Sequence, residues 1–179
     1  MHGMQAYPTA LSQARPAVRA AAAIAGVGAA TMLGAYFFQY VMGLPPCPLC
    51  LEQRIAYYVS IPLAVIVAIG GGARSGKAPR LLLAAGLGII ALAMLGNAGL
   101  GTYHAGIEWK WWPGPQECSG TGTDLGSGGD LLSSLSNVTL VRCDEAAWRF
   151  LGVSLAGYNA IISLGLAAIA AWGARSEVR

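Results

Sequence analysis

The sequence predicts an all-α membrane protein, a four-transmembrane-helix bundle with two outer loops, the second of them long and flexible. Of its 179 residues, 55% are hydrophobic and only 11% are charged, whereas an ordinary soluble domain carries about 25% charged residues. The apolar residues gather in four blocks, each about as long as the ~20 residues that a helix needs to cross a bilayer. We therefore expect one integral membrane domain over residues 1–179.

The four apolar blocks define the expected spans. The first covers about residues 20–40; it is longer than the ~7–15-residue apolar region of a signal peptide and ends in aromatic residues, so we interpret it as a retained span. The other three spans are expected at about 49–68, 81–103 and 148–172. The loops between them on the outer side are then about 41–48 and 104–146.

The distribution of charge orients these spans. Seven basic residues and one acid, Glu177, lie before the first span, between the second and third, and after the fourth. The seven bases are Arg15, Arg19, Arg74, Lys77, Arg80, Arg175 and Arg179. The opposite loops hold Lys110 and Arg142 against six acids. Because basic residues concentrate on the cytoplasmic side, we expect both termini in the cytoplasm and all four cysteines outside.

The two outer loops differ in length and composition. Residues 41–48 form a tight hairpin rich in Pro and Gly, whereas the long loop opens with tryptophans that suit the membrane–water interface. Its Gly-rich part, 119–130, is expected to be flexible. The following stretch, Leu131–Val141, either lies flat on the membrane surface or packs as a loop on the helix ends.

Cys47 and Cys50 form a CxxC motif at the outer mouth of the second span. Cys50 lies near the helix N-terminus, where unpaired N–H groups and the macrodipole favour a thiolate. Arg54 is one turn further along the same helix face. Its permanent charge favours that thiolate, and its donors suit a ligand carbonyl oxygen. The alternative is that Arg54 only extends to the interface, without a functional role.

The other two cysteines, Cys118 and Cys143, lie in the long outer loop. They form a structural disulfide, belong to a four-cysteine zinc site, or form a mobile disulfide that exchanges with a partner's thiol. The zinc spacing is a weak match, and the Gly, Ser and Thr residues around them favour mobility. His104, just past the expected third span, is either a hydrogen-bonding or solvated residue or part of a ligand pocket beside Arg54.

Few polar residues interrupt the spans. Gln39, Asn97 and Asn159 are expected to form interhelical hydrogen bonds. Glycines of the third span are expected to allow close helix approach; they are Gly86, Gly88, Gly96, Gly99 and Gly101. A transporter more often carries charged or broken-helix sites near the midplane, and here the unusual residues crowd the outer surface instead.

Three segments together resemble the DsbB family of disulfide-bond-forming membrane proteins. They are PCPLCLEQR, ending at Arg54; YHAGIEWKWWPGPQEC, ending at Cys118; and CDEAAWRFLG, from Cys143. The resemblance covers the chain from the first span to the fourth. It implies a multi-pass protein of the bacterial inner membrane that reoxidises a periplasmic DsbA-like thioredoxin-fold protein and passes the electrons to a membrane quinone, ubiquinone or menaquinone. No nucleic acid partner is expected.

The resemblance also implies residue roles. The redox-active disulfides are Cys47–Cys50 and Cys118–Cys143. Cys118 would form the mixed disulfide with the partner, Cys143 would then pair with Cys47, and Cys50 would be released as a thiolate beside the quinone. The implied quinone-binding residues are Arg54 and His104.

Two other interpretations compete with this one. A non-catalytic membrane scaffold or transport subunit would hold structural disulfides, which resist glutathione-range potentials, whereas relay disulfides exchange. A vitamin K epoxide reductase-like protein also joins a CxxC to a quinone, but its CxxC typically lies late in the chain. Here the CxxC lies in the second span.

Overall fold

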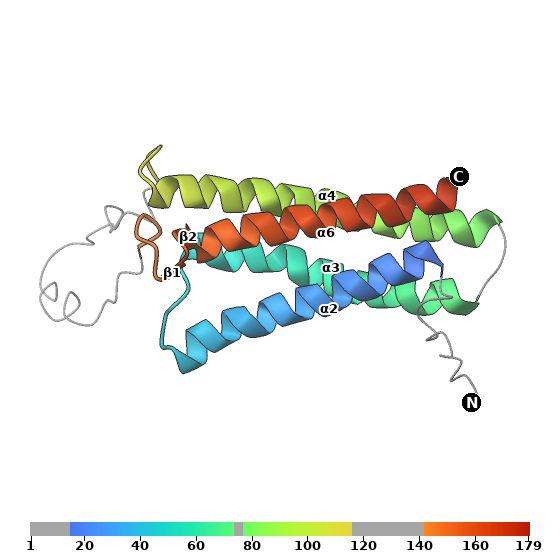
Figure 1. The fold of residues 1–179 in the computed structure, drawn as a ribbon, viewed down its shortest axis with the longest axis horizontal. Helices are drawn as coiled ribbons and strands as arrows, with labels where there is room; N and C mark the ends of the chain where they lie inside the picture. The colour runs from blue at the N-terminus through green and yellow to red at the C-terminus, as the bar shows by residue number, and fades with distance from the viewer. Residues whose placement is uncertain (1–14, 74–76, 116–141) are drawn as a thin grey trace, which may run out of the picture.

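The computed structural model describes residues 15–73, 77–115 and 142–179. The long helices are α2 (Pro16–Tyr36), α3 (Pro48–Ala73), α4 (Lys77–Glu108) and α6 (Leu155–Val178), and a π-helical turn, η1 (Phe37–Val41), continues α2. These helices lie side by side in an elongated bundle (Figure 1). The prediction of an all-α protein with four helices long and apolar enough to cross a membrane is confirmed.

The outward faces of the bundle suit lipid. In hydrocarbon every backbone N–H and C=O group must bond within the protein, and a helix achieves this within one segment. Leu33, Ile66 and Leu92 point away from the bundle and are 69%, 64% and 72% exposed. Such a large apolar surface is stable in a bilayer and unfavourable in water.

The inner faces form one core along the bundle axis. All four long helices contribute to it, and its largest fully buried side chains include Ile24, Leu87, Ile90, Met94 and Leu166. This core fixes the relative positions of the helices. It therefore also fixes the side chains that the helix ends present to each other.

Two of the five glycines expected to permit close helix approach do so. A Cβ at Gly86 would lie 2.9 Å from a side-chain carbon of Val67, and one at Gly101 would lie 3.0 Å from the backbone nitrogen of Ala160. The expectation is wrong for three others, where a Cβ would meet nothing within 4 Å: Gly88, Gly96 and Gly99. At these three positions the face of α4 that a Cβ would occupy is open space.

The third helix extends further than predicted. The expected span ended at residue 103, but α4 continues to Glu108. It ends where Lys110 adopts a positive φ of 61° and the Trp111 N–H bonds the Gly106 carbonyl, an arrangement that commonly stops helices. His104 therefore lies inside the helix near its end, rather than in the outer loop where it was predicted.

The fourth helix begins later than predicted. The expected span started at about residue 148, but the chain first forms a small hairpin of β1 (Arg149–Phe150) and β2 (Val153–Ser154). Leu151 and Gly152 adopt φ of 49° and 82°, as a two-residue hairpin turn requires. α6 then starts at Leu155, because the Ser154 hydroxyl caps it by accepting a hydrogen bond from the Gly157 N–H.

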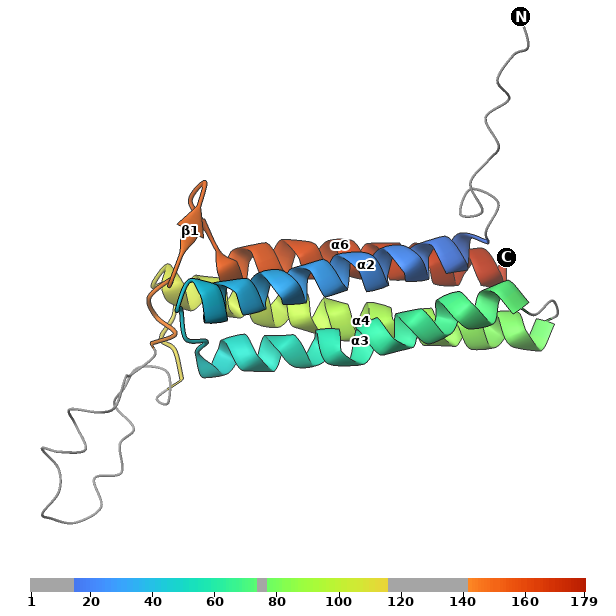
Figure 2. The ribbon, with the colours of Figure 1, turned by 90° about the horizontal axis from the view of Figure 1, so that it is seen from below.

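The segments that carry the candidate site residues lie at one end of the bundle. The start of α3, the end of α4 and the hairpin before α6 are together at the left in Figures 1 and 2. All the cysteines in the described part of the chain belong to this end.

Candidate active site

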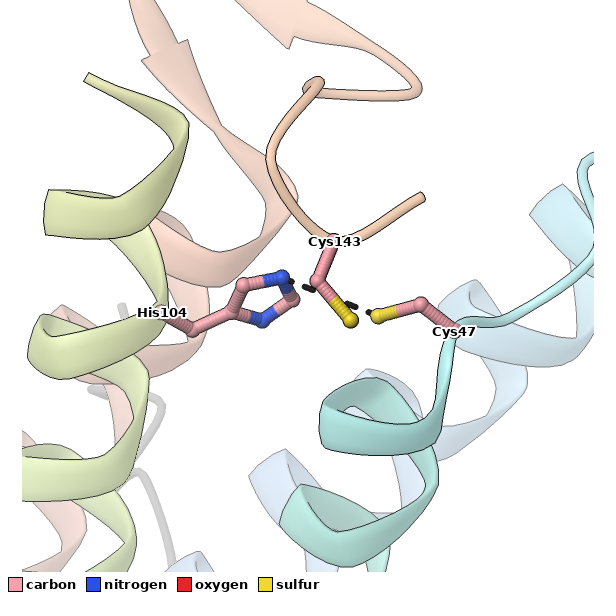
Figure 3. Close-up of side chains that lie close together, drawn as sticks. All are labelled: Cys47, His104 and Cys143. Atoms are coloured by element: carbon pink, nitrogen blue, oxygen red, sulfur yellow. Dashed lines mark hydrogen bonds between the residues drawn. The ribbon is translucent and has the colours of Figure 1, made fainter. Parts of the chain in front are cut away.

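Cysteine and histidine side chains from three segments meet at this end of the bundle. Cys47 directly precedes α3, His104 lies near the end of α4, and Cys143 lies in the segment before β1. Figure 3 shows the sulfurs of Cys47 and Cys143 facing each other, with the His104 ring beside them. All three side chains are buried, with at most 4% exposed. The bundle thus brings residues that are far apart in the sequence together in one buried cluster.

The Cys47 sulfur is within reach of two other cysteines. It lies 2.9 Å from the Cys50 sulfur, to which it donates a hydrogen bond, and it accepts a weaker one from the Cys50 N–H at 3.3 Å. The Cys47 and Cys143 sulfurs and a His104 ring nitrogen all lie within 4.8 Å of one another. A disulfide needs a sulfur–sulfur distance of about 2.05 Å. Small side-chain movements therefore suffice to join Cys47 to either Cys50 or Cys143.

The proton of the reduced pair resides on Cys47. Its hydrogen bond to Cys50 raises the pKa of the Cys47 thiol to about 12, burial acts in the same direction, and the hydrogen bond with His104 acts against it. Cys50 is the hydrogen-bond acceptor of the pair. Acceptor is the role that a thiolate takes, so the geometry agrees with the predicted thiolate at Cys50.

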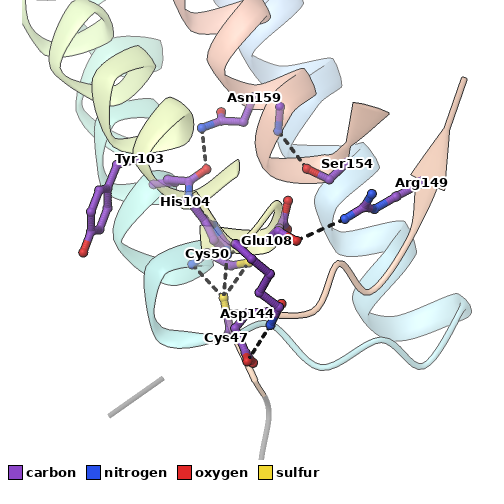
Figure 4. A network of polar contacts seen from close by, with 12 residues as sticks. Cys47, Cys50, Tyr103, His104, Glu108, Asp144, Arg149, Ser154 and Asn159 are labelled. Carbon is purple, nitrogen blue, oxygen red and sulfur yellow. Dashed lines mark hydrogen bonds and ion pairs between the residues drawn. The ribbon is translucent and has the colours of Figure 1, made fainter. Parts of the chain in front are cut away.

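His104 contacts Cys47 and lies apart from Arg54. Its Nε2 atom lies 3.6 Å from the Cys47 sulfur and 3.9 Å from Oε1 of Glu108, a buried acid one turn further along α4. Its Nδ1 atom lies 2.8 Å from the side-chain nitrogen of Gln53. Figure 4 shows Cys47, Cys50, His104 and Glu108 close together, in a network of polar contacts that also includes Asn159. The hydrogen-bonding interpretation of His104 therefore describes its position in this structure.

A mostly apolar cavity of about 420 Å³ opens beside Cys50. Cys50 and Arg54 both line it, as expected for residues one turn apart on the same helix face. Its walls come from α2, the segment before α3, α3, the hairpin region and α6, and they include the aromatic rings of Phe38 and Trp148. His104 is not among the residues described as lining it.

The Arg54 side chain is held in place by α2. Its Nη1 atom donates a hydrogen bond to Oε1 of Gln39 at 2.7 Å, and its guanidinium carbon lies 5.3 Å from the centre of the Tyr36 ring. Gln39 thereby forms the interhelical hydrogen bond expected of it. An arginine fixed by two partners at a cavity wall has a defined orientation toward a ligand, which a side chain extended freely to the interface lacks.

Ion pairs hold the segment that carries Cys143 to the end of α4. Asp144 accepts hydrogen bonds from Arg142 and from Lys110, and Lys110 also bonds the Asp144 backbone oxygen, at 2.8 Å. Arg142 and then Lys110 hold the pKa of the Asp144 carboxyl well below its usual range. Because Asp144 follows Cys143 directly, these contacts position the Cys143 sulfur.

The same cluster has the donor types of a zinc site. Two sulfurs and one imidazole nitrogen are ligands that zinc prefers. Zinc needs the sulfurs as thiolates, so a bound ion would compete with any disulfide between Cys47 and Cys143. The fourth cysteine of the zinc interpretation, Cys118, lies outside the described residues.

Comparison with known proteins places the chain in a family. The family model described as "Disulfide bond formation protein DsbB" matches residues 17–173. The chain belongs to the DsbB family. It is therefore a multi-pass membrane protein with a role as a thiol–disulfide oxidoreductase in disulfide bond formation.

Individual relatives agree with the family match. A protein of Methylococcus capsulatus is 33% identical over 149 residues, which cover 78% of this chain and 83% of the relative. One of Saccharophagus degradans is 31% identical over 147 residues, covering 79% and 82%. Both are named "Disulfide bond formation protein B". No solved structure matches the chain significantly.

Several predictions for this DsbB-family chain fall on residues that the structure does not describe. Cys118, the Gly-rich segment 119–130 and the stretch Leu131–Val141 all lie between the described ranges. The pairing Cys118–Cys143 and the flexibility of the long loop therefore stay predictions.

Two buried polar residues of the site were missed by sequence reasoning. Gln53 is 5% exposed and Glu108 is 8% exposed, and both approach His104. The available signals were their positions: Gln53 follows Cys50 by three residues, and Glu108 follows His104 by four, so each shares a helix face with a candidate residue.

Proposed function

We propose that this DsbB-family chain is a quinone-dependent thiol oxidase that reoxidises a periplasmic DsbA-like thioredoxin-fold protein and passes the electrons to a membrane quinone, ubiquinone or menaquinone. The observation that carries the proposal is the position of the Cys47 sulfur. It lies in contact with Cys50, which borders the cavity, and within 4.8 Å of Cys143, which belongs to the outer segment.

The first half of the reaction is disulfide exchange on the outer side. A thiolate of the reduced partner attacks Cys118 in the Cys118–Cys143 disulfide, forming a mixed disulfide and releasing Cys143 as a thiolate. Cys143 then attacks Cys47: the Cys47–Cys143 bond forms, the Cys47–Cys50 bond breaks, and its electron pair leaves on Cys50. The proximity of Cys47 and Cys143 supports this step, and their burial protects it from external thiols.

The second half takes place at the cavity. About 420 Å³ falls within the ~300–1,000 Å³ typical of sites for small molecules, and apolar walls with a few fixed polar groups are typical too. A quinone supplies a two-electron acceptor when bound. Cys50 lies at the wall as the electron donor, and Arg54, fixed by Gln39 and Tyr36, is oriented to donate hydrogen bonds to a carbonyl oxygen and to stabilise the thiolate.

The role of His104 as a quinone ligand stays a prediction. Its contact with the Cys47 sulfur supports a part in the exchange half of the reaction, before electrons reach the cavity. We also propose that the chain lies in the bacterial inner membrane with both termini in the cytoplasm. This orientation rests on the excess of basic residues at the start of α2, from the end of α3 through the first turn of α4, and at the end of α6.

The test is quinone reduction by the purified full chain in nanodiscs on adding a reduced DsbA-type protein. Wild type is expected to reduce ubiquinone-1 or a menaquinone analogue, and Cys50→Ala is expected to abolish this activity. No reduction by wild type, or full activity of Cys50→Ala, would overturn the proposal. Disulfides that resist glutathione-range potentials in a redox titration would favour the scaffold interpretation.

A further inference from the structure

A buried chain of polar side chains leads from Cys47 into the interior of the bundle. Gln53 is 5% exposed and lies between two partners. One of its ends is 2.8 Å from Nδ1 of His104, and the other accepts a hydrogen bond of 2.6 Å from the side-chain nitrogen of Asn159 on α6. Asn159 is in turn bonded by Tyr57 on α3, at 2.8 Å, and by Asn97 on α4, at 3.3 Å. Three helices thus contribute to one network.

The donors of this network determine which group donates and which accepts in each of its hydrogen bonds. Tyr57 and Asn97 both donate to Oδ1 of Asn159, so the Asn159 nitrogen must donate to Gln53. Gln53 accepts with its oxygen, which leaves its nitrogen to donate to Nδ1 of His104. A neutral imidazole that accepts at Nδ1 carries its proton on Nε2.

The other ring nitrogen faces acceptors, which agrees with this assignment. Nε2 of His104 lies 3.6 Å from the Cys47 sulfur and 3.9 Å from the Glu108 carboxylate. A proton on Nε2 can be donated to the Cys47 sulfur, whereas a bare Nε2 would set its lone pair against those of the sulfur and of the nearby carboxyl oxygen. The contacts of Nδ1 and those of Nε2 therefore both favour the Nε2–H tautomer.

We propose that Gln53 is a positioning residue for the disulfide exchange: held by Asn159, it fixes His104 as the Nε2–H tautomer, which donates a hydrogen bond to the Cys47 sulfur. The functional part of this inference rests on the proposed thiol oxidase function. The partner's second thiol attacks the partner sulfur of the mixed disulfide, which releases the oxidised partner and a Cys118 thiolate. When that Cys118 thiolate attacks Cys143 in the Cys47–Cys143 disulfide, the Cys118–Cys143 bond forms and the electron pair of the broken bond goes to Cys47. Cys47 is 4% exposed, so water cannot stabilise that thiolate, and the imidazole N–H takes this role.

A purely structural role predicts a different outcome. Polar residues commonly join helices in membranes through hydrogen bonds of modest strength, and such a role needs no particular His104 tautomer. The tautomer is therefore the observable that separates the two roles.

The decisive measurement is the ¹⁵N spectrum of the imidazole in the reduced full chain. The chain has two histidines, so His2→Ala leaves His104 as the single signal. Wild-type Gln53 is expected to give the Nε2–H tautomer. Gln53→Glu keeps the shape but presents an acceptor to Nδ1, so Nδ1 is expected to become protonated. An Nδ1–H tautomer in the presence of Gln53, or no change in Gln53→Glu, would overturn the proposal.

A matched control lies on the same helix. Ser60 is fully buried on α3, and its hydroxyl has no hydrogen-bond partner among the residues that the structure describes. Ser60→Ala is expected to leave the His104 signal unchanged. Because the wild-type spectrum alone identifies the tautomer, the proposal stays testable if a Gln53 variant fails to fold.

The kinetic measurement connects the tautomer to the exchange. Gln53→Met removes both amide contacts at similar volume and is expected to lower kcat at saturating quinone by about tenfold, the effect of losing a hydrogen bond to a charged group. An unchanged kcat with a change confined to the quinone KM would overturn the exchange role. Absence of thiol oxidase activity in wild type would instead refute the proposed function, and the tautomer result would stand independently.

Discussion

The two sides of Cys47 differ in their surroundings. On the exchange side, Cys143 and His104 are almost completely buried, and ion pairs of Asp144 hold the Cys143 segment to α4. On the cavity side, Cys50 is partly exposed to a mostly apolar space that Arg54 also lines. The contrast shows how one sulfur can serve two kinds of chemistry: thiol exchange between fixed, shielded sulfurs, and electron transfer to a ligand that must enter and leave.

Removing Cys50 is expected to have the largest effect, because electrons can then no longer pass from the exchange side to the cavity side. Cys50→Ala should lower quinone reduction by about a thousandfold or more, as for loss of a reacting group. Without Cys50 the Cys47–Cys50 disulfide cannot exist, so the Cys143 thiolate that the partner releases has no disulfide to attack. The reduced partner should therefore be oxidised once per chain, at the expense of Cys118–Cys143, as measured by mass spectrometry without reduction. Repeated oxidation of the partner by Cys50→Ala would contradict the order of steps.

Changing Arg54 is expected to affect the cavity side alone. Arg54→Met should raise the quinone KM by about tenfold or more, since a charge-assisted hydrogen bond to the ligand is lost. Steady-state rates at varied quinone concentration measure this. Arg80→Met, whose side chain pairs with Glu177 at the opposite end of the bundle, is the matched control and should leave KM unchanged. An equal KM in Arg54→Met and wild type would remove Arg54 from the site.

Breaking the polar network is expected to lower stability by a moderate amount. Asn159→Leu removes one hydrogen bond from each of Gln53, Tyr57 and Asn97, although Tyr57 and Asn97 keep their contacts with Ser163, and it should reduce the free energy of unfolding by about 1–3 kcal/mol. Denaturant titration in detergent measures this. Thr102→Val is the control, because among the residues that the structure describes Thr102 bonds only the Ala98 carbonyl of its own helix. Similar losses in both variants would show that the shared network adds nothing.

Acidification is expected to have the smallest effect, confined to the exchange side. Since the pKa of Asp144 is lowered in the folded chain, its contribution is present above the ordinary carboxyl pKa of about 3.9 and is lost as the pH falls below it. Wild type should thus lose slightly more thermal stability than Asp144→Asn between neutral pH and about pH 3. Glu145→Gln should behave as wild type, because Glu145 is exposed and, within the described ranges, has one ion pair, with Arg142 at 3.6 Å.

Hydropathy was sufficient to predict the number of spans and the bundle, because a run of apolar residues long enough to cross a bilayer has few other stable conformations. It could not place the helix ends. Trp148 and Phe150 are as apolar as a span, yet Leu151 and Gly152 turn the chain there, and Ser154 caps the next helix. Caps and turns depend on a few backbone contacts that average hydropathy does not register.

The site was predicted in part for a similar reason. Cys50 and Arg54 share a face of one helix, so spacing alone placed them together. His104 and Gln53 belong to different helices, and their contact depends on how α3 and α4 pack. Sequence reasoning singled out His104 and missed Gln53, because nothing in the sequence indicates which residue of α3 meets His104.

The central claim is that the Cys47 sulfur moves between Cys50 and Cys143, and a chain with only Cys47 and Cys143 tests it most directly. In the Cys50→Ala, Cys118→Ala double variant, mild oxidation followed by acid quench and peptide mass spectrometry should reveal a Cys47–Cys143 disulfide in nearly all molecules. Two alkylatable thiols after oxidation, or disulfides only between separate chains, would contradict the account.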